Sequence, residues 1–195
     1  LEEYARWSTK PIINALTDLE HPCQALADFM TIKEEFGSFK DTTLTFIGDG
    51  NNVSNSLILC SALLGSKIRI ACPKGYEPIS SIINKAKELS IKPDNIFITN
   101  DIEKAVKGAN ILYTDVWSSM GQENTRSSKE KVFSEYSINS NILRLADTKA
   151  IVMHCLPAYR GKEITDEVIE CTQSRIFDQA ENRMHAQQAL LSELL

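Results

Sequence analysis

A histidine, a cysteine and a proline end an apolar run near residue 155. The run Ala150-Ile151-Val152-Met153 has the composition of a buried strand, and His154-Cys155-Leu156-Pro157 follows it directly. Pro157 lacks an N–H group and cannot continue a central strand, so Cys155 is expected at the carboxyl edge of a sheet. Ligands of open α/β sheets bind at that edge. An exposed cysteine there could be a nucleophile or a substrate contact.

The nucleophile hypothesis needs a base within reach of the thiol. Neighbouring residues on a strand point to opposite faces, so His154 is poorly placed to activate Cys155. A role as a substrate contact beside Asp115 therefore fits better, and a small buried apolar side chain is the simplest alternative.

Two further turns carry polar side chains after expected strands. Asp115 lies near the end of a strand, followed by a turn at Ser119-Met120-Gly121, and this group could bind an ammonium unless Asp115 only forms an Asx-turn. The sequence Gly-Asp-Gly-Asn-Asn at 48–52 could hold an anion at a helix start. Its dinucleotide fingerprint is incomplete. Asn52 is either the helix N-cap or a ligand-gripping amide.

His21, Gln24 and Arg183 are candidates outside the sheet. Pro22 suits the first helical position, which makes His21 the expected N-cap of a helix over 21–36. His21 and Gln24 then lie on one side of that helix and could bind a carbonyl oxygen and an NH₂ group, or form a simple capping box. Arg183, in a helix over 179–195, is either a ligand contact or a solvated ion-pair partner.

The chain alternates strand-like and helix-like runs. Strands are expected at 44–50, 67–73, 95–100, 111–117 and around 150–155, with helices at 55–65, 79–90 and 102–109. This alternation predicts an α/β fold, a doubly wound parallel five-stranded sheet of Rossmann-like type, with two flanking helices that belong to no βαβ crossover.

Composition excludes several classes of protein. Of the 195 residues, 43% are apolar and 24% are charged, as in an ordinary globular protein. The net charge is −5 and the sequence has no long run of like charges, which disfavours a nucleic-acid or membrane-surface role. No apolar segment approaches the roughly 18 residues that cross a bilayer. Five cysteines without Cys-x-x-Cys spacing indicate a reduced, cytoplasmic chain without a zinc site.

Six segments together resemble the transcarbamylase family and, within it, the ornithine enzymes. The matching segments, in the family's order, are HPCQALAD (21–28), GDGNN (48–52), PKGYEP (73–78), DVWSSMGQE (115–123), HCLPAYRG (154–161) and ENRMHAQQALL (181–191). The HCLP segment combined with the Ser-Met-Gly turn is specific to the ornithine branch.

The resemblance implies a role for each matching residue. It places Asn52, Asp115, Ser119 and Met120 at the α-amino and α-carboxylate groups of L-ornithine. It places Cys155 and Leu156 beside the δ-amino group and the carbamoyl NH₂, and His21, Gln24 and Arg183 around the carbonyl of carbamoyl phosphate. The implied reaction needs no metal and no organic cofactor, and the implied assembly is a homotrimer.

The resemblance also implies a missing part. Family members carry a Ser-Thr-Arg-Thr phosphate-binding loop in an N-terminal domain, and this sequence has none, so about half of the expected chain is missing. We expect residues 1–36 to be the remnant and linker helix of that domain, 37–178 the ornithine-binding domain and 179–195 a second linker helix. The two helices should expose apolar surface, and the polypeptide alone should be inactive as a transferase.

Three alternatives remain open at this point. A non-catalytic amino-acid-binding or regulatory domain would keep the same site. A nicotinamide-dependent oxidoreductase rests on fold analogy alone, and the incomplete glycine fingerprint opposes it. A transcarbamylase for a diamine such as putrescine is disfavoured, because a diamine has no α-carboxylate for the Ser-Met-Gly turn to hold.

Overall fold

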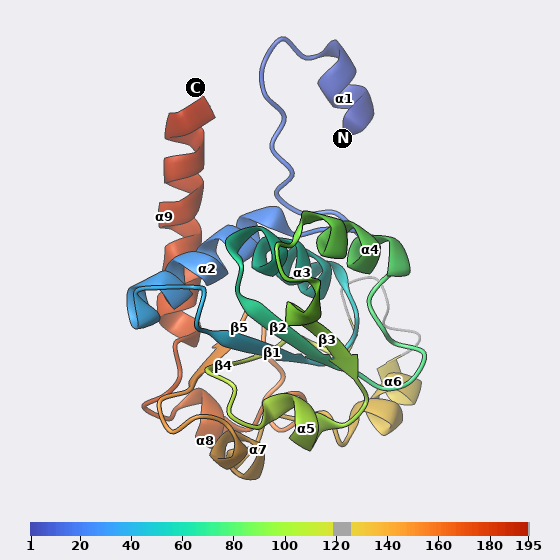
Figure 1. The fold of residues 1–195 in the computed structure, drawn as a ribbon, viewed down its shortest axis with the longest axis vertical. Coiled ribbons are helices and arrows are strands. Elements are labelled where there is room, and N and C mark those ends of the chain that lie inside the picture. Colours follow the sequence, from blue (N-terminus) through green and yellow to red (C-terminus); the bar gives the residue numbers. More distant parts are fainter. Residues whose placement is uncertain (119–125, 195) are drawn as a thin grey trace.

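A computed structural model describes residues 1–118 and 126–194 of the chain (Figure 1). Five strands form one sheet: β1 (Thr43–Ile47), β2 (Lys67–Ala71), β3 (Ile96–Thr99), β4 (Ile111–Thr114) and β5 (Ile151–His154). The larger helices are α2 (Pro22–Phe36), α3 (Asn52–Leu64), α4 (Ser80–Leu89), α6 (Arg126–Phe133) and α9 (Ile176–Leu194). Shorter helices are α1 (Glu2–Trp7), η1 (Pro93–Asn95), α5 (Ile102–Val106), α7 (Ser140–Leu145) and α8 (Asp166–Ile169).

All strand pairs are parallel, and the strand order is β3-β2-β1-β4-β5. This confirms the expected doubly wound sheet. The order reverses between β1 and β4, because the chain builds outward from β1 on one side and then returns to start β4 on the other. The carboxyl ends of β1 and β4 therefore border the crevice in which such sheets bind ligands.

Strand alternation divides the core into two layers. Leu44 and Phe46 of β1 face a cluster formed with α2, α3 and α4, whereas Ile47 faces a second cluster formed with α5 and the residues around α6 to α8. Figure 1 shows these helices on opposite faces of the sheet. The strands are nearly all buried apart from β3 and part of β2, which explains why the sequence reads as short continuous apolar runs.

The helix ends follow local chemistry. Pro22 opens α2, and Gly37 closes it with φ 71°, a left-handed conformation that glycine adopts without steric cost. Gly65 closes α3 in the same way. The expected helix over 102–109 ends earlier, at Val106, because Gly108 at φ 66° turns the chain into β4.

The helices α2 and α9 pack against each other rather than only flanking the domain. Asn182 of α9 donates to Thr31 and Glu34 of α2, and Phe29 and Ile32 of α2 belong to the first core cluster. The large apolar side chains that stay exposed on these helices are Leu26 on α2 and Phe177, Met184, Leu191 and Leu194 on α9. The domain boundaries at 36/37 and 178/179 stay a prediction.

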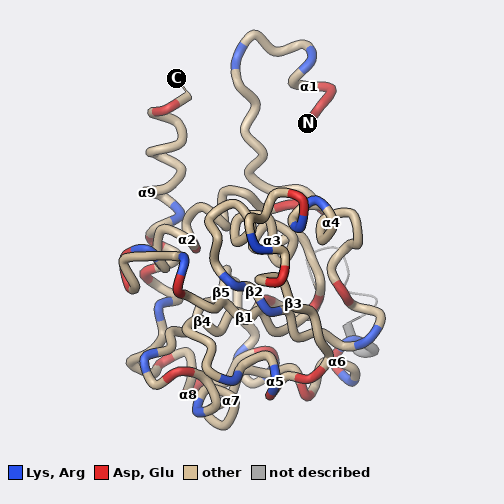
Figure 2. Tube along the Cα trace, in the orientation of Figure 1, with Lys and Arg blue, Asp and Glu red and all other residues tan. Residues whose placement is uncertain are grey.

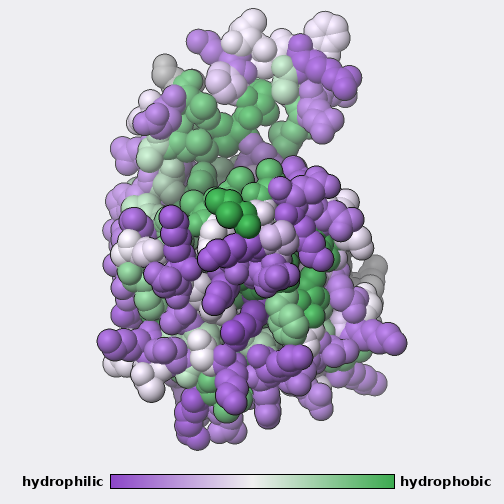
Figure 3. Space-filling model, viewed as in Figure 1, coloured by the Kyte–Doolittle hydropathy of each residue, from purple (hydrophilic) through white to green (hydrophobic). Residues whose placement is uncertain are grey.

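The N-terminal segment and the end of α9 project from the same side of the molecule (Figure 1), and apolar side chains are visible between them in Figure 3. Acidic and basic residues are interspersed along the rest of the chain (Figure 2), in keeping with the small net charge. In the described ranges 1–118 and 126–194, no helix combines the length and the apolar content that a membrane crossing requires.

Candidate functional site

The site is a cleft of about 380 Å³ at the carboxyl ends of β1, β4 and β5. Its walls come from the starts of α2 and α3, from the segments after β4 and β5, and from α9. Among its lining residues are His21, Asn52, Asp115, Cys155, Leu156 and Arg183. Six of the nine residues that the sequence analysis singled out therefore meet in one cavity, which has the size of a small-molecule site.

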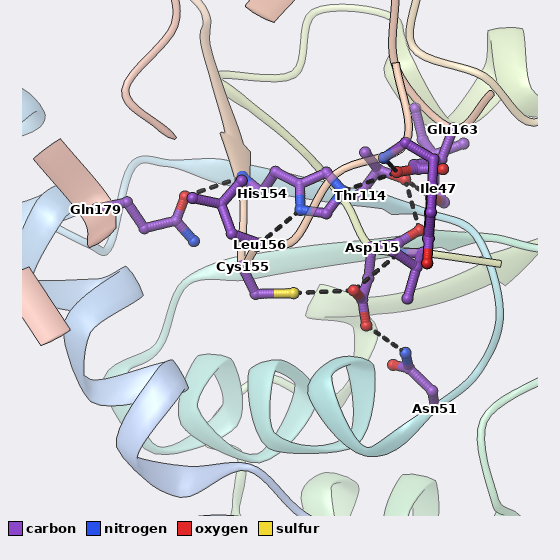
Figure 4. Close-up of polar contacts among 11 residues, drawn as sticks. Ile47, Asn51, Thr114, Asp115, His154, Cys155, Leu156, Glu163 and Gln179 are labelled. Carbon is purple, nitrogen blue, oxygen red and sulfur yellow. Dashed lines mark hydrogen bonds and ion pairs between the residues drawn. The ribbon is translucent and has the colours of Figure 1, made fainter. Parts of the chain in front are cut away.

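The Asp115 carboxylate is held at the cleft by three hydrogen bonds (Figure 4). It lies just beyond β4 and is 7% exposed. Its Oδ2 accepts from Asn51 Nδ2 at 2.6 Å, and its Oδ1 accepts from Val116 N at 2.7 Å and from the Cys155 thiol at 3.0 Å. The contact with Val116 is a bond to the next residue along the chain, not the Asx-turn of the alternative interpretation, which needs the N–H two residues on. The other two contacts come from distant segments and fix the carboxylate at the cleft.

Cys155 is held as a neutral thiol. Burial, and then the neighbouring Asp115 carboxylate, raise the pKa of Cys155 well above its usual value. A thiol with a raised pKa that donates to a carboxylate is a poor nucleophile at neutral pH. The structure thus favours the substrate-contact hypothesis over the nucleophile hypothesis.

His154 does not serve as a base for Cys155. Its Nε2 lies 3.2 Å from Glu163 Oε1, and its Nδ1 accepts the Leu156 N–H at 2.9 Å. Both ring nitrogens therefore have partners other than the thiol, in agreement with the argument from strand alternation.

The same contacts shape the loop that carries Cys155 and Leu156. Glu163 is 1% exposed and also accepts from Tyr159 N at 2.5 Å. Leu156 has φ 58°, a left-handed conformation that is costly for a leucine unless the surroundings hold it. The His154–Glu163 pair and the Leu156 N–H bond supply that hold.

The two asparagines that follow β1 make different contacts. Asn51, not Asn52, is the N-cap of α3, and its Oδ1 accepts from Val53 N and Ser54 N at 3.1 Å. The N-cap alternative for Asn52 was wrong, because the helix begins at that residue. Asn52 instead donates to Thr17 O at 2.7 Å, which holds the segment before α2 against the cleft.

Gly50 packs closely against a neighbouring loop. Its N–H donates to Tyr76 O at 2.8 Å, and a Cβ on it would lie 2.3 Å from Pro78 N. The glycine is thus needed for the close approach of the 76–78 loop, and not necessarily for that of a ligand. The dinucleotide interpretation loses its support.

Replacing Asn51 by alanine should destabilise the fold by about 2.5 kcal/mol, of which about 1 is the lost cap and about 1.5 the lost bond to the Asp115 carboxylate. Urea unfolding would measure it. Asn139→Ala is the matched control, because Asn139 caps α7 through the same two backbone bonds without contacting a site residue. Equal losses in the two variants would contradict a special role for the Asn51–Asp115 contact.

His21 occupies the N-cap position of α2 but makes no side-chain capping bond. Its backbone N–H donates to Ser56 Oγ at 2.8 Å, which fixes the residue against α3. Burial, and then the charge of Arg183, lower the pKa of His21, so its ring is neutral at physiological pH. Its Nδ1 is buried without a hydrogen-bond partner in the described part of the chain.

Gln24 and Arg183 form a direct pair. Arg183 Nη1 donates to Gln24 Oε1 at 2.5 Å, so Gln24 does not form the capping box and Arg183 is not a purely solvated cation. Arg183 lines the cleft, whereas Gln24 is 1% exposed and is not one of its lining residues. Arg183 Nε, like His21 Nδ1, is buried and unpartnered among the described residues.

Ser119 and Met120, which the resemblance assigns to the amino-acid end of the ligand, lie outside the described residues. Conversely, Lys162 and Glu163 line the cleft although the sequence analysis did not select them. They follow the HCLPAYRG segment directly, and that position was the available signal.

One group of side chains has the composition of a metal site. Ligand atoms of Asp115, His154 and Cys155 lie within 4.8 Å of one another. The raised thiol pKa and the two engaged nitrogens of His154 oppose coordination, which needs a thiolate and a free nitrogen. The expectation that no metal takes part stays a prediction.

Family models match most of this chain. The aspartate/ornithine carbamoyltransferase Asp/Orn binding domain matches residues 40–194, and the carbamoyl-P binding domain of the same family matches residues 1–34. The chain belongs to the aspartate/ornithine carbamoyltransferase family. Within this family, the chain carries one domain and the end of the other.

Several relatives of this chain are named ornithine carbamoyltransferase. Those of Prochlorococcus marinus subsp. pastoris and of Synechocystis are 70% and 53% identical to it over all 195 residues, which span 63% of each relative. The expectation that about half of the family's length is missing was therefore too high, and the description of the chain as a C-terminal half was slightly wrong.

Solved ornithine carbamoyltransferases share the fold. The enzyme from Pyrococcus furiosus superposes with a TM-score of 0.94 at 44% identity, and that from Gloeobacter violaceus with 0.90 at 46%. Both matches cover 100% of this chain and, respectively, 62% and 65% of the solved chains.

Proposed function

We propose that this chain supplies the ornithine-binding part of an ornithine carbamoyltransferase. The enzyme would transfer the carbamoyl group of carbamoyl phosphate to the δ-amino group of L-ornithine, giving L-citrulline and phosphate. The observation that carries the proposal is the meeting of Asp115, Cys155, His21 and Arg183 in one cleft at the switch point of the sheet. The sequence relatives named ornithine carbamoyltransferase support the same assignment.

The amino acid would bind at the Asp115 end of the cleft. An ionised carboxylate that is already oriented by Asn51 and Val116 is a good acceptor for an ammonium group. Asn52 would add an amide beside it. The Cys155 thiol, which donates to Asp115, would lie next to the reacting amine. It would contact the amine without being acylated.

The carbamoyl group would bind at the His21 and Arg183 end. A free amine must attack the carbonyl, and because an aliphatic ammonium has a pKa near ~10.4, the site must favour its deprotonated form. Attack turns the carbonyl oxygen into an oxyanion that needs positioned donors. The Arg183 guanidinium and the His21 ring would meet that need, because both line the cleft.

Several further expectations stay predictions. They are the substrate-binding roles of Gln24, Leu156, Ser119 and Met120, the homotrimeric assembly, the cytoplasmic location and a role in arginine metabolism. We further propose that the apolar residues exposed on α9 contact the remainder of the carbamoyl-phosphate-binding domain.

The test is citrulline formation by a chain in which this segment follows the complete carbamoyl-phosphate-binding domain of the Prochlorococcus relative. We expect turnover with L-ornithine and none with putrescine. Arg183→Met should lower the rate by about 100-fold, as loss of one oxyanion donor does. A folded chimera that binds L-ornithine but forms no citrulline would overturn the transferase assignment and favour a non-catalytic binding domain.

A further inference from the structure

Asp28 is a buried carboxylate that lies behind the cleft. It sits one helical turn after Gln24 on α2, and its side chain is completely inaccessible to solvent. Its Oδ1 accepts from Gln24 Nε2 at 2.8 Å and from Gln179 Nε2 at 2.7 Å, and its Oδ2 accepts from the Tyr113 hydroxyl at 3.0 Å. The three donors come from α2, α9 and β4.

These contacts determine which way two amides point. An ionised carboxylate only accepts hydrogen bonds, so it turns the NH₂ end of each neighbouring amide toward itself and the oxygen away. The oxygen of Gln24 then accepts from Arg183 Nη1, and the oxygen of Gln179 accepts from His154 N at 2.9 Å. The orientations of the two amides therefore affect Arg183, which lines the cleft, and His154, which precedes Cys155.

We propose that Asp28 is a positioning residue, whose carboxylate orients the Gln24 amide so that its oxygen holds the Arg183 guanidinium at the cleft. If Gln24 were reversed, its NH₂ group would face the guanidinium, which has donors only. Arg183 would lose its anchor and move away from the place where a carbonyl oxygen would bind. The inference rests on the proposed function for its catalytic meaning, but not for the orientation itself.

Asp28 could have a simpler role, which is to join α2 to α9, and that role predicts a different effect of substitution. The same two helices are also joined by Asn182, which donates to Thr31 Oγ1 at 3.0 Å. Thr31→Val would remove this bond at nearly constant size and so weaken the tie, although Asn182 still donates to Glu34 Oε2 at 2.7 Å, and it would leave Gln24 and Arg183 unchanged. If Asp28 only joins helices, the two substitutions should have the same consequences.

The protonation of Asp28 gives an independent probe. Burial raises its pKa to about 7, partly offset by its bonds to Gln24, Gln179 and Tyr113. Arg183 of α9 also lowers its pKa. Other ionisable groups that interact electrostatically with Asp28 are Tyr113 of β4, Cys60 of α3 and Cys155 after β5. A protonated Asp28 can donate to the Gln24 oxygen, so acid should favour reversal of the amide.

The experiment is side-chain NMR of the uniformly ¹⁵N-labelled 195-residue chain between pH 5.5 and pH 8.5, with the Gln24 NH₂ signal assigned by its loss in Gln24→Glu. In the wild type, we expect the Gln24 and Arg183 Nε–H signals to shift together with a midpoint of about 7. Asp28→Asn should abolish this titration and leave Arg183 at its low-pH position. Thr31→Val should retain both signals and the midpoint.

Two outcomes would overturn the proposal. One is a wild-type Gln24 signal that does not titrate, which needs no variant to fold. The other is an Asp28→Asn spectrum in which Gln24 and Arg183 move no more than in Thr31→Val. As a second variant, Tyr113→Phe keeps the carboxylate but removes a bond that lowers its pKa, so the midpoint should rise.

Kinetics of the chimera separates this inference from the proposed function. Asp28→Asn should raise the KM for carbamoyl phosphate by about tenfold, the value of one hydrogen bond to a charged group, and leave that for L-ornithine unchanged. If the NMR result holds while both KM values stay unchanged, the orientation by Asp28 is supported and the assignment of Arg183 to carbamoyl phosphate fails.

Discussion

Asp115→Asn should weaken the binding of L-ornithine by about 10- to 100-fold, since a hydrogen bond to a charged group is worth about 1.5–3 kcal/mol. The amide has no charge for the ligand's ammonium group. Its NH₂ end would also face one of the three donors that now point at the carboxylate, from Asn51, Val116 and Cys155. Calorimetric titration of the 195-residue chain with L-ornithine measures the change.

Asp18→Asn is the matched control for this result. Asp18 also lines the cleft, but it is exposed to solvent. The control should bind L-ornithine as the wild type does. If Asp18→Asn and Asp115→Asn weaken binding equally, general charge in the cleft rather than the oriented carboxylate attracts the ligand.

Glu163→Ala should cost about 3 kcal/mol of unfolding free energy, because each buried donor that loses its acceptor costs about 1–3 kcal/mol and His154 Nε2–H is one such donor. Glu163 and His154 are each 1% exposed, and the substitution also leaves Tyr159 N without its acceptor. The loop that presents Cys155 and Leu156 would lose its hold. Urea unfolding gives the stability, and L-ornithine titration shows whether the site loosens with it.

The control here is Glu170→Ala. Glu170 pairs with Arg160 at 2.6 Å on the surface, where such contacts contribute little. We expect no measurable loss of stability. Should Glu163→Ala not fold, Glu163→Gln keeps the size and one acceptor oxygen and should lie between the wild type and the alanine variant. A Glu163→Ala protein as stable as Glu170→Ala would refute the loop-holding role.

The strands could be predicted from sequence because the sheet is buried by helices on both faces. Each strand is a short apolar run bounded by glycine or proline, and parallel strands covered by helices on both faces have this pattern. The position of Cys155 after β5 followed from Pro157 alone. The ends of α5 and α9 were misplaced by up to three residues, because glycine turns and tertiary packing rather than helical periodicity decide them.

The hydrogen bonds of the site could not be predicted from local sequence patterns. Asn51 and Asn52 are adjacent and chemically identical, so only the position of the helix start decides which one caps α3 and which one reaches Thr17. Asp28 depends on Tyr113, 85 residues away, and on Gln179, 151 residues away. Nothing in the local pattern of α2 distinguishes such a carboxylate from an exposed one.

The most direct test of the account is a ¹H–¹⁵N titration of the labelled 195-residue chain with L-ornithine. We expect saturable backbone shifts at Asn52, Asp115, Cys155 and Leu156. We expect none around Arg144 and Cys171, which line a separate surface pocket beside α7 and α8. Putrescine at equal concentration should produce weaker shifts. Saturable shifts confined to residues outside the cleft, or equal responses to both amines, would contradict an amino-acid site built on Asp115.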